Sequence, residues 1–225
     1  MDASTKLWYL ENFNLLESLN MAEKMSMSEK ISDKSLEKGQ VIYFPGDTSA
    51  TVYFLKKGKV KISKISDEGK EMIIAILGPG EIFGELAIAG QEEHDQIAEA
   101  TEDAMICSMS IQLMEEMLEQ YPKLNLSMTK LIGLRLKKVQ SRLEALCFKS
   151  APQRIKHYIK ELVEEYGRDV GYEKEVKLSL THQDIANLTA TTRQTVTLVM
   201  RELEKDNIIL YDRRRILVRD MNALN

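Results

Sequence analysis

The residue types best suited to recognition chemistry gather between Leu180 and Ile209. Apolar positions here recur at about 100° per residue, which predicts an amphipathic helix from Thr192 to about Lys205. Its buried side is expected to carry Val196, Val199, Met200 and Leu203. Its outer side carries Arg193, Gln194, Thr197, Leu198 and Arg201. Arginine pairs with guanine, glutamine with adenine, and threonine or an aliphatic side chain contacts the thymine methyl group. The outer side therefore suits a reader of base edges, and it also suits an ordinary solvated surface.

A shorter helix is predicted to precede this one and to hold it in place. Thr181 followed three residues later by Asp184 resembles a capping box at its start. A tight turn at residues 189–190 follows, after which Thr191 or Thr192 can cap the second helix. The spacing predicts a helix-turn-helix that places the second helix in a major groove.

A β-hairpin with a basic tip is predicted beyond these helices, from Ile208–Tyr211 and Ile216–Val218. Basic and hydroxyl side chains at such tips and at helix starts contact phosphates, which position a protein on DNA without reading its sequence. The predicted backbone contacts are Thr181, His182, Thr192, Thr195, Arg201, Arg213, Arg214 and Arg215. The predicted base contacts are Arg193, Gln194, Thr197 and Leu198.

Charge is divided unevenly along the 225 residues, although the net charge is only −4. Residues 1–121 hold 11 Lys, no Arg and 22 Asp or Glu, for a net of −11. Residues 122–149 hold seven bases against Glu144 alone, for +6, and residues 150–225 hold 13 bases against 12 acids, for +1. All ten arginines lie at or after Arg135. Because guanidinium suits bidentate contact with phosphate and base edges, nucleic-acid chemistry is expected in the C-terminal part.

The predicted secondary structure also changes along the chain. Short β-rich runs separated by turn residues predict a small β-barrel or β-roll, with runs at 40–44, 51–55, 59–65, 71–77 and 104–109. A helix follows whose apolar residues are spaced 4, 3, 4, 3, like the seam of a two-stranded coiled coil. This dimer seam comprises Ile132, Leu136, Val139, Leu143 and Leu146, and Met128 extends it one step backwards. Leu131 and Leu134 offer a second apolar face to the β domain, so a helix packed only on its own domain is the alternative.

Two groups of motifs, in this order, resemble the Crp/Fnr family of transcription regulators over essentially the whole chain. The first group is Phe44-Pro45-Gly46-Asp47, Gly58, Gly69, Gly78-Pro79-Gly80 and Phe83-Gly84-Glu85-Leu86. The second group is Leu180-Thr181-His182-Gln183-Asp184-Ile185-Ala186 and Thr192-Arg193-Gln194-Thr195-Val196. The resemblance implies an α+β fold in three parts. These are a cyclic-nucleotide-binding-like β-roll effector domain with N-terminal helices (1–121), a central dimerisation helix (122–149) and a winged helix-turn-helix DNA-binding domain (150–225).

The resemblance also implies a function and partners. The chain is expected to be a cytoplasmic, sequence-specific regulator that binds a palindromic operator in double-stranded DNA as a homodimer. RNA polymerase is an expected partner, a small-molecule effector is an open one, and no membrane is involved. The family's guanine-reading arginine matches Arg193, but Gln194 stands where many members have Glu, and Leu198 stands where a second Arg is often found.

The effector pocket departs from the family pattern. Its residues, if it is used, are Gly84, Glu85, Leu86, His94, Asp95, Val139 and Gln140. Cyclic-nucleotide-binding members have an Arg-Ser pair that grips the cyclic phosphate, and His94-Asp95 stands in its place, although the ribose-binding glutamate is present as Glu85. No other arginine lies in the predicted sensor domain, and the local carboxylates would repel a phosphate. Cyclic AMP is therefore not the expected ligand. A cyclic-nucleotide response, a different small ligand such as 2-oxoglutarate, which related regulators use, and no ligand at all remain open.

Other chemistries find little support. No cysteine precedes Cys107, which argues against an N-terminal iron–sulfur cluster, and the scattered histidines do not form a metal site. Cys107 is expected to be a buried structural thiol, and for Cys147 a packed thiol is favoured over an intersubunit disulfide. No cofactor and no enzyme activity are expected, because nucleophile–base–acid sets and phosphate loops are absent. A kinase-control module and a protein–protein adaptor that uses the same helices are the competing classes. The longest apolar stretch, 72–77, is too short for a membrane span, and no signal segment is seen at the N-terminus.

Overall fold

The structure is a computed structural model that describes residues 14–16, 19–177, 180–212 and 215–224. It divides into two compact units, Met1–Leu136 and Lys137–Asn225, and the boundary falls inside one long helix, α4 (Pro122–Phe148). Two predicted backbone contacts, Arg213 and Arg214, lie outside the described residues. In the part of the chain that is described, no helix is long and apolar enough to cross a bilayer.

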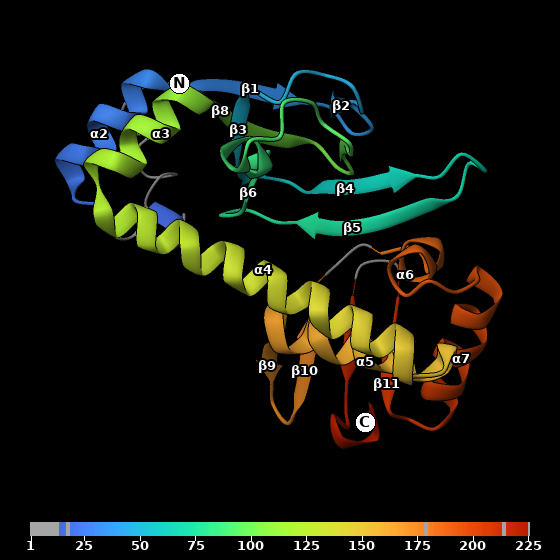
Figure 1. The fold of residues 1–225 in the computed structure, drawn as a ribbon. Coiled ribbons are helices and arrows are strands. Elements are labelled where there is room, and N and C mark those ends of the chain that lie inside the picture. Colours follow the sequence, from blue (N-terminus) through green and yellow to red (C-terminus); the bar gives the residue numbers. More distant parts are fainter. Residues whose placement is uncertain (1–13, 17–18, 178–179, 213–214, 225) are drawn as a thin grey trace. The chain divides into compact units, whose positions relative to one another are not determined.

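Two four-stranded antiparallel sheets form the first unit (Figure 1). Its strands are β1 (Ser32–Leu36), β2 (Val41–Tyr43), β3 (Thr51–Lys57), β4 (Val60–Ile65), β5 (Glu71–Leu77), β6 (Ile82–Phe83), β7 (Ile97–Ala100) and β8 (Ala104–Ser110). One sheet has the order β1-β8-β3-β6 and the other β2-β7-β4-β5. The helical segments are η1 (Asn14–Leu16), α2 (Met21–Lys30), η2 (Glu85–Ala89), α3 (Ile111–Gln120) and the first half of α4.

Side chains along β3 and β8 alternate between two hydrophobic cores, one on each face of their sheet. Phe54 and Cys107 face a cluster that the helices cover, whereas Leu55 and Ile106 face a cluster between the two sheets. Successive side chains of a strand point to opposite faces, so one sheet of this type can support two cores. The buried Cys107 agrees with the structural thiol expected from the sequence.

The β-roll architecture predicted from the sequence is confirmed, but three of its strands were not predicted. β1 reads Ser-Asp-Lys-Ser-Leu and is mostly exposed at a sheet edge, so it has no apolar alternation to detect. β6 has two residues, too few for a period of two to be recognised, and β7 has four, Ile-Ala-Glu-Ala, in which apolar and polar residues do not alternate. These strands form because tertiary pairing with β3, β8, β2 and β4 satisfies their backbone groups.

The second unit contains helices packed with a small antiparallel sheet. Its elements are the second half of α4, α5 (Ala151–Tyr166), β9 (Arg168–Val170), β10 (Glu173–Val176), α6 (His182–Leu188), α7 (Arg193–Lys205), β11 (Ile209–Tyr211), β12 (Ile216–Val218) and η3 (Asn222–Leu224). The sheet order is β11-β12-β10-β9. The predicted helix-turn-helix and hairpin are present, whereas β9 and β10 were not predicted, because their short polar sequences resemble loop.

The residues of the predicted dimer seam are exposed on helix α4. Its seam residues Ile132, Leu136, Val139, Leu143 and Leu146 are between 46% and 60% exposed in the single chain. Large apolar side chains in a row along one helix leave a stripe that a second copy of the helix would cover. The partner copy itself remains a prediction.

Three apolar or thiol residues of α4 do not lie where the sequence analysis placed them. Met128 is 3% exposed and belongs to the core of the first unit, so the seam does not extend back to it. Leu131 packs on that core as expected, but Leu134 is 62% exposed and does not. Cys147 is exposed in the single chain rather than packed. The heptad pattern could not distinguish these cases. It indicates which side of the helix is apolar, but not how far along the helix the core of the first unit covers it.

Replacement of a seam leucine by a charged residue is expected to separate a dimer. Leu143→Glu places like charges opposite each other in a parallel seam and removes about 1.5–3 kcal/mol of burial per leucine, so the dimer dissociation constant should rise at least roughly tenfold. The matched control is Leu134→Glu, an equally exposed leucine of the same helix that lies off the seam. Sedimentation equilibrium over a concentration series measures both. Equal shifts in the two variants, or none in either, would contradict the predicted seam.

Candidate nucleic-acid interface

Side-chain caps define the start of both helices in the α6–α7 pair, and the cap of α6 is reciprocal. Thr181 Oγ1 accepts a hydrogen bond from the Asp184 N–H at 3.1 Å, while the Asp184 carboxylate accepts one from the Thr181 N–H at 2.8 Å. At α7, Thr192 Oγ1 accepts from the Thr195 N–H at 3.2 Å, so Thr192 and not Thr191 is the N-cap. The caps satisfy backbone donors that each first helical turn leaves unpaired.

Arg154 on α5 fastens the turn between α6 and α7. Its Nε donates to the Thr189 carbonyl at 2.8 Å and its Nη2 donates to the Ala190 carbonyl at 2.9 Å. Ala190 has φ = 49°, a left-handed conformation that an alanine adopts only where its surroundings compensate for the strain. Arg154 is a positioning residue that the sequence analysis missed. No local signal could have found it, because it lies 35 residues upstream of its partner.

Helix α7 presents its predicted outer face to solvent. The opposite face, Val196, Val199, Met200 and Leu203, is buried. Arg193, Gln194, Leu198 and Arg201 are exposed, and Thr197 is half-buried. The exposed Leu198 is a large apolar side chain on a helix whose other leucine, Leu203, is buried, which fits a residue that contacts a methyl group of a partner.

His182 connects the start of α6 to α7 and to β11. Its Nδ1 lies 2.9 Å from Thr197 Oγ1, whose hydroxyl also donates to the Arg193 carbonyl at 2.9 Å, and its ring packs at 5.6 Å from that of Tyr211. With the hydroxyl hydrogen given to Arg193, Nδ1 carries the hydrogen that Thr197 accepts. Burial lowers the pKa of His182, and the positive charges of Arg193 and Arg201 lower it further. The imidazole is therefore neutral at pH 7, and its bond to Thr197 restricts how that side chain can turn toward a base.

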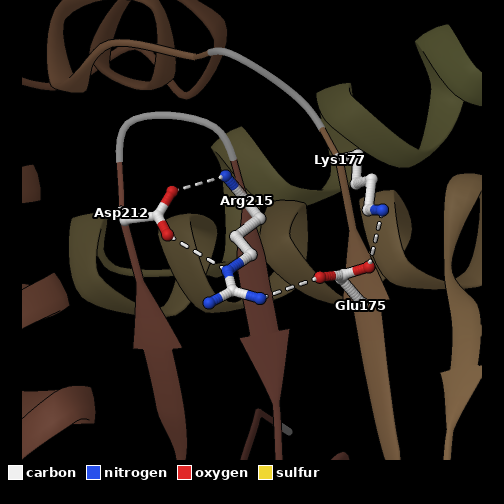
Figure 2. A pocket seen from close by; sticks show the side chains of 4 residues that line it. All are labelled: Glu175, Lys177, Asp212 and Arg215. Atoms are coloured by element: carbon white, nitrogen blue, oxygen red, sulfur yellow. Dashed lines mark hydrogen bonds and ion pairs between the residues drawn. The ribbon is translucent and has the colours of Figure 1, made fainter.

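The hairpin tip holds Arg215 in a network of carboxylates. Arg215 Nε donates to Asp212 Oδ2 at 3.0 Å, and its Nη1 donates to Glu175 Oε1 on β10 at 3.3 Å (Figure 2). Lys177 Nζ lies 3.5 Å from the other oxygen of Glu175. The four side chains line a cleft of about 480 Å³. The predicted phosphate contact Arg215 is thus already paired within the chain.

In the first unit, the candidate effector pocket contains an ion pair that the sequence analysis did not foresee. Arg135 of α4 pairs with the carboxylate of Glu85 and donates to the carbonyl of Ile82. No arginine precedes Arg135 in the chain, but the first unit extends to Leu136, so the helix brings this arginine to the β-roll. Residues 1–121 contain no arginine, as the sequence analysis stated, but it did not anticipate that Arg135 of the following helix pairs with Glu85. Gly84 has φ = 77°, and a Cβ there would lie 2.5 Å from the Thr51 carbonyl oxygen, so the backbone at this position requires glycine.

Aromatic side chains occupy the space beside this pair. The ring of His94 stacks on that of Tyr43 with centroids 3.6 Å apart, and Tyr53 stacks on Phe83 at 4.9 Å. His94 is only 7% exposed, and burial lowers its pKa, although Asp47 and Asp95 act in the opposite direction. Asp95 pairs with Lys64, whose hydrogen bond lowers the pKa of that carboxyl group. His94 and Asp95 are thus engaged by neighbours of their own.

The remaining pocket residues are divided between the two units. Leu86 is exposed beside Glu85, whereas Val139 and Gln140 belong to the second unit. Among the described residues, no group of three or more His, Cys, Asp or Glu side chains could hold a metal ion.

Comparison with known proteins places both halves of the chain. Residues 33–121 match the model of the cyclic nucleotide-binding domain, and residues 153–225 match that of the Crp-like helix-turn-helix domain. A global nitrogen regulator of Synechocystis is 29% identical over 85% of this chain and 86% of its own length. A structure of a CooA mutant from Carboxydothermus hydrogenoformans has a TM-score of 0.80 at 28% identity and covers 94% of each chain. A transcriptional regulator of the CRP/FNR family from Thermus thermophilus has a TM-score of 0.63 at 25% identity, covering 86% of this chain and 96% of its own.

Cyclic AMP and cyclic GMP are expected not to bind in the micromolar range. Arg135 is paired with Glu85 and Lys64 with Asp95, and burial lowers the pKa of His94, so the cations at this site are already matched by carboxylates or disfavoured by burial. Isothermal titration calorimetry of each nucleotide into the purified chain measures this. Saturable heat with a micromolar dissociation constant for either nucleotide would contradict the expectation.

Proposed function

The chain belongs to the Crp/Fnr family of transcription regulators, and from this premise we propose that it binds a palindromic DNA site as a homodimer and reads that site with α7. The observation that carries the proposal is that α7 is buried on one side and exposed on the other. A buried apolar face anchors the helix, and Arg193, Gln194 and Leu198 are exposed on the opposite side. These residue types recognise guanine, adenine and the thymine methyl group in the major groove.

The starts of α6 and α7 are proposed to contact the DNA backbone. Their first residues carry the hydroxyl and imidazole groups of Thr181, His182, Thr192 and Thr195. The positive end of the helix dipole at such helix starts favours a phosphate. Arg201, exposed one turn beyond Thr197, adds a cation for the same backbone. Arg213 and Arg214 are proposed for the same role from the sequence alone.

The dimer is proposed to form through the exposed seam of α4. A two-fold axis along the seam would give two copies of α7 related by symmetry, so the operator should be a palindrome with half-sites about 34 Å apart, one turn of B-DNA. The exposure of all five seam side chains supports this arrangement. Related regulators act on DNA, so a cytoplasmic location, RNA polymerase as a partner and a non-enzymatic role are part of the same proposal.

Effector control is proposed not to depend on cyclic AMP. The pairs Arg135–Glu85 and His94–Tyr43 support this proposal, because each uses a group that a cyclic nucleotide would need. Two forms of control remain compatible with it: a different small ligand that displaces these pairs, and a dimer that binds DNA without any ligand.

Binding-site selection from a random duplex library tests the function directly. The purified protein is used without an effector at one fixed salt concentration, because affinity for DNA falls steeply with salt. Enrichment of a palindrome supports a ligand-independent regulator, and enrichment only after addition of a metabolite extract supports a ligand-dependent one. Absence of any enriched sequence under both conditions would contradict the proposed function.

The selected consensus is expected to differ from the TGTGA half-site of the cyclic AMP receptor type. Gln194 favours adenine where a glutamate would accept from the cytosine amino group, and Leu198 cannot form the bidentate pair of a second arginine. An unchanged TGTGA half-site would count against the assigned base contacts.

Loss of Arg193 is expected to relax the sequence preference at one position of each half-site. Arg193→Ala should cost about 1–3 kcal/mol on the selected site and much less on a site changed at that position. The matched comparison is Arg201→Ala, an exposed arginine of the same helix that should weaken all sequences alike. Fluorescence anisotropy on a panel of single-base variants measures both. Uniform losses in both variants would show that Arg193 does not read a base.

A further inference from the structure

Two acidic residues hold Arg215 at the base of the β11–β12 turn. Asp212 accepts from the Arg215 backbone N–H through Oδ1 at 3.1 Å and from the guanidinium through Oδ2 at 3.0 Å, and its own N–H donates to the Arg215 carbonyl at 3.0 Å. Glu175 accepts from the far end of the same guanidinium. Figure 2 shows the guanidinium lying between these two carboxylates, one from each side.

Glu175 is the least exposed member of the network. Its side chain is 11% exposed, against 49% for Arg215 and 54% for Asp212. It lies on β10, which pairs with β12 in the middle of the sheet, so its carboxylate is carried by a well-supported strand. Arg215 therefore connects the turn to the sheet, since one guanidinium can donate to two carboxylates at once.

The two carboxylates change what Arg215 can contribute to DNA binding. Two of the five N–H donors of Arg215 serve the carboxylates, and the negative charges of Asp212 and Glu175 offset the positive charge that would attract a phosphate. Held as it is, Arg215 connects Asp212, at the end of β11, and the start of β12 to Glu175 on β10. Arg213 and Arg214 are its neighbours in the sequence.

We propose that Arg215 is a positioning residue of the β11–β12 hairpin, and that Glu175 acts through it to support binding of the hairpin to the DNA backbone. The inference deepens the proposed function, on which it rests. It assigns to an acidic residue a favourable effect on binding to a polyanion. The alternative, in which Arg215 contacts a phosphate and Glu175 merely competes for it, gives the opposite sign for the same substitution.

The first test is Glu175→Gln in the full-length protein, with affinity for the selected duplex measured over a salt series. The positioning role predicts affinity weaker by roughly threefold to tenfold and a shallower salt dependence, because phosphate contacts of a loosened hairpin are lost. Competition predicts tighter binding with an unchanged or steeper dependence. Affinity equal to or tighter than that of the parent protein would overturn the proposal.

A matched control removes the same charge from the same strand. Glu173→Gln lies two residues away on β10, and its partner is Arg219 at 3.1 Å rather than Arg215. The loss of one negative charge near DNA acts in both variants, so the difference between them isolates the contact with Arg215. Equal effects of the two variants would overturn the proposal.

Arg215→Lys provides a variant that is expected to fold, since the side chain is half exposed. Lysine keeps the charge but offers one nitrogen in place of a planar fork, so it cannot bridge Asp212 and Glu175 in the same way. The positioning role predicts weakening close to that of Arg215→Ala, and a phosphate contact predicts affinity near that of the parent. A combined Glu175→Gln and Arg215→Ala variant should bind no more weakly than Arg215→Ala alone, because both act through one contact.

The outcomes separate this inference from the proposed function. If the parent protein selects no site, the function itself has failed. If it selects a site and Arg215→Lys binds like the parent, only the positioning role is overturned. Thermal unfolding shows whether each variant is folded under the conditions of the binding measurements. A titration with DNA at concentrations well above the dissociation constant gives the fraction of each protein that binds, so a change in salt dependence can be assigned to the folded molecule.

Discussion

Burial of one side of α7 is the constraint on which the DNA interface depends. Four apolar side chains on that side, each contributing about 1.5–3 kcal/mol when buried, decide how the helix is rotated on α5, α6 and β11. The rotation leaves Arg193, Gln194 and Leu198 exposed on the outward side. Caps at Thr181 and Thr192 set where the helices begin, and Arg154 holds the strained turn between them. The reading face is thus a consequence of packing behind it.

Polar pairs have a different part in each unit. In the first unit, Arg135 pairs with Glu85 and His94 stacks on Tyr43, so these side chains already contact one another within the chain. In the second unit, carboxylates hold an arginine beside the region proposed to meet DNA. Charge therefore has to be considered pair by pair. The balance of +1 over residues 150–225 conceals both exposed cations on α7 and cations that are matched by acids on the hairpin.

Polar contacts between residues far apart in the sequence account for most of the structural features that the sequence analysis did not predict. Arg154 lies 35 residues from the Thr189 carbonyl, Arg135 lies 50 from Glu85, and Arg215 lies 40 from Glu175. Local patterns report only neighbours within a helical turn or along a strand. Such distant partners are chosen by the way elements pack, and this is also why His182, expected at a phosphate, additionally bonds Thr197.

The sequence by itself determined the β-roll, the long helix, the helix-turn-helix and the side of α7 that faces outward, because these follow from hydrophobic period, turn residues and capping boxes. It also located the exposed apolar stripe of α4 that is the predicted dimer seam, since a spacing of 4 and 3 is a local property of the helix. Only the tertiary structure decided that Met128 is buried while Leu134 is exposed, that β1, β6 and β7 are strands, and which cations have acidic partners. The physical reason is the range of the interactions. Periodicity and caps act within a few residues, whereas burial and ion pairing depend on what a distant part of the chain brings alongside.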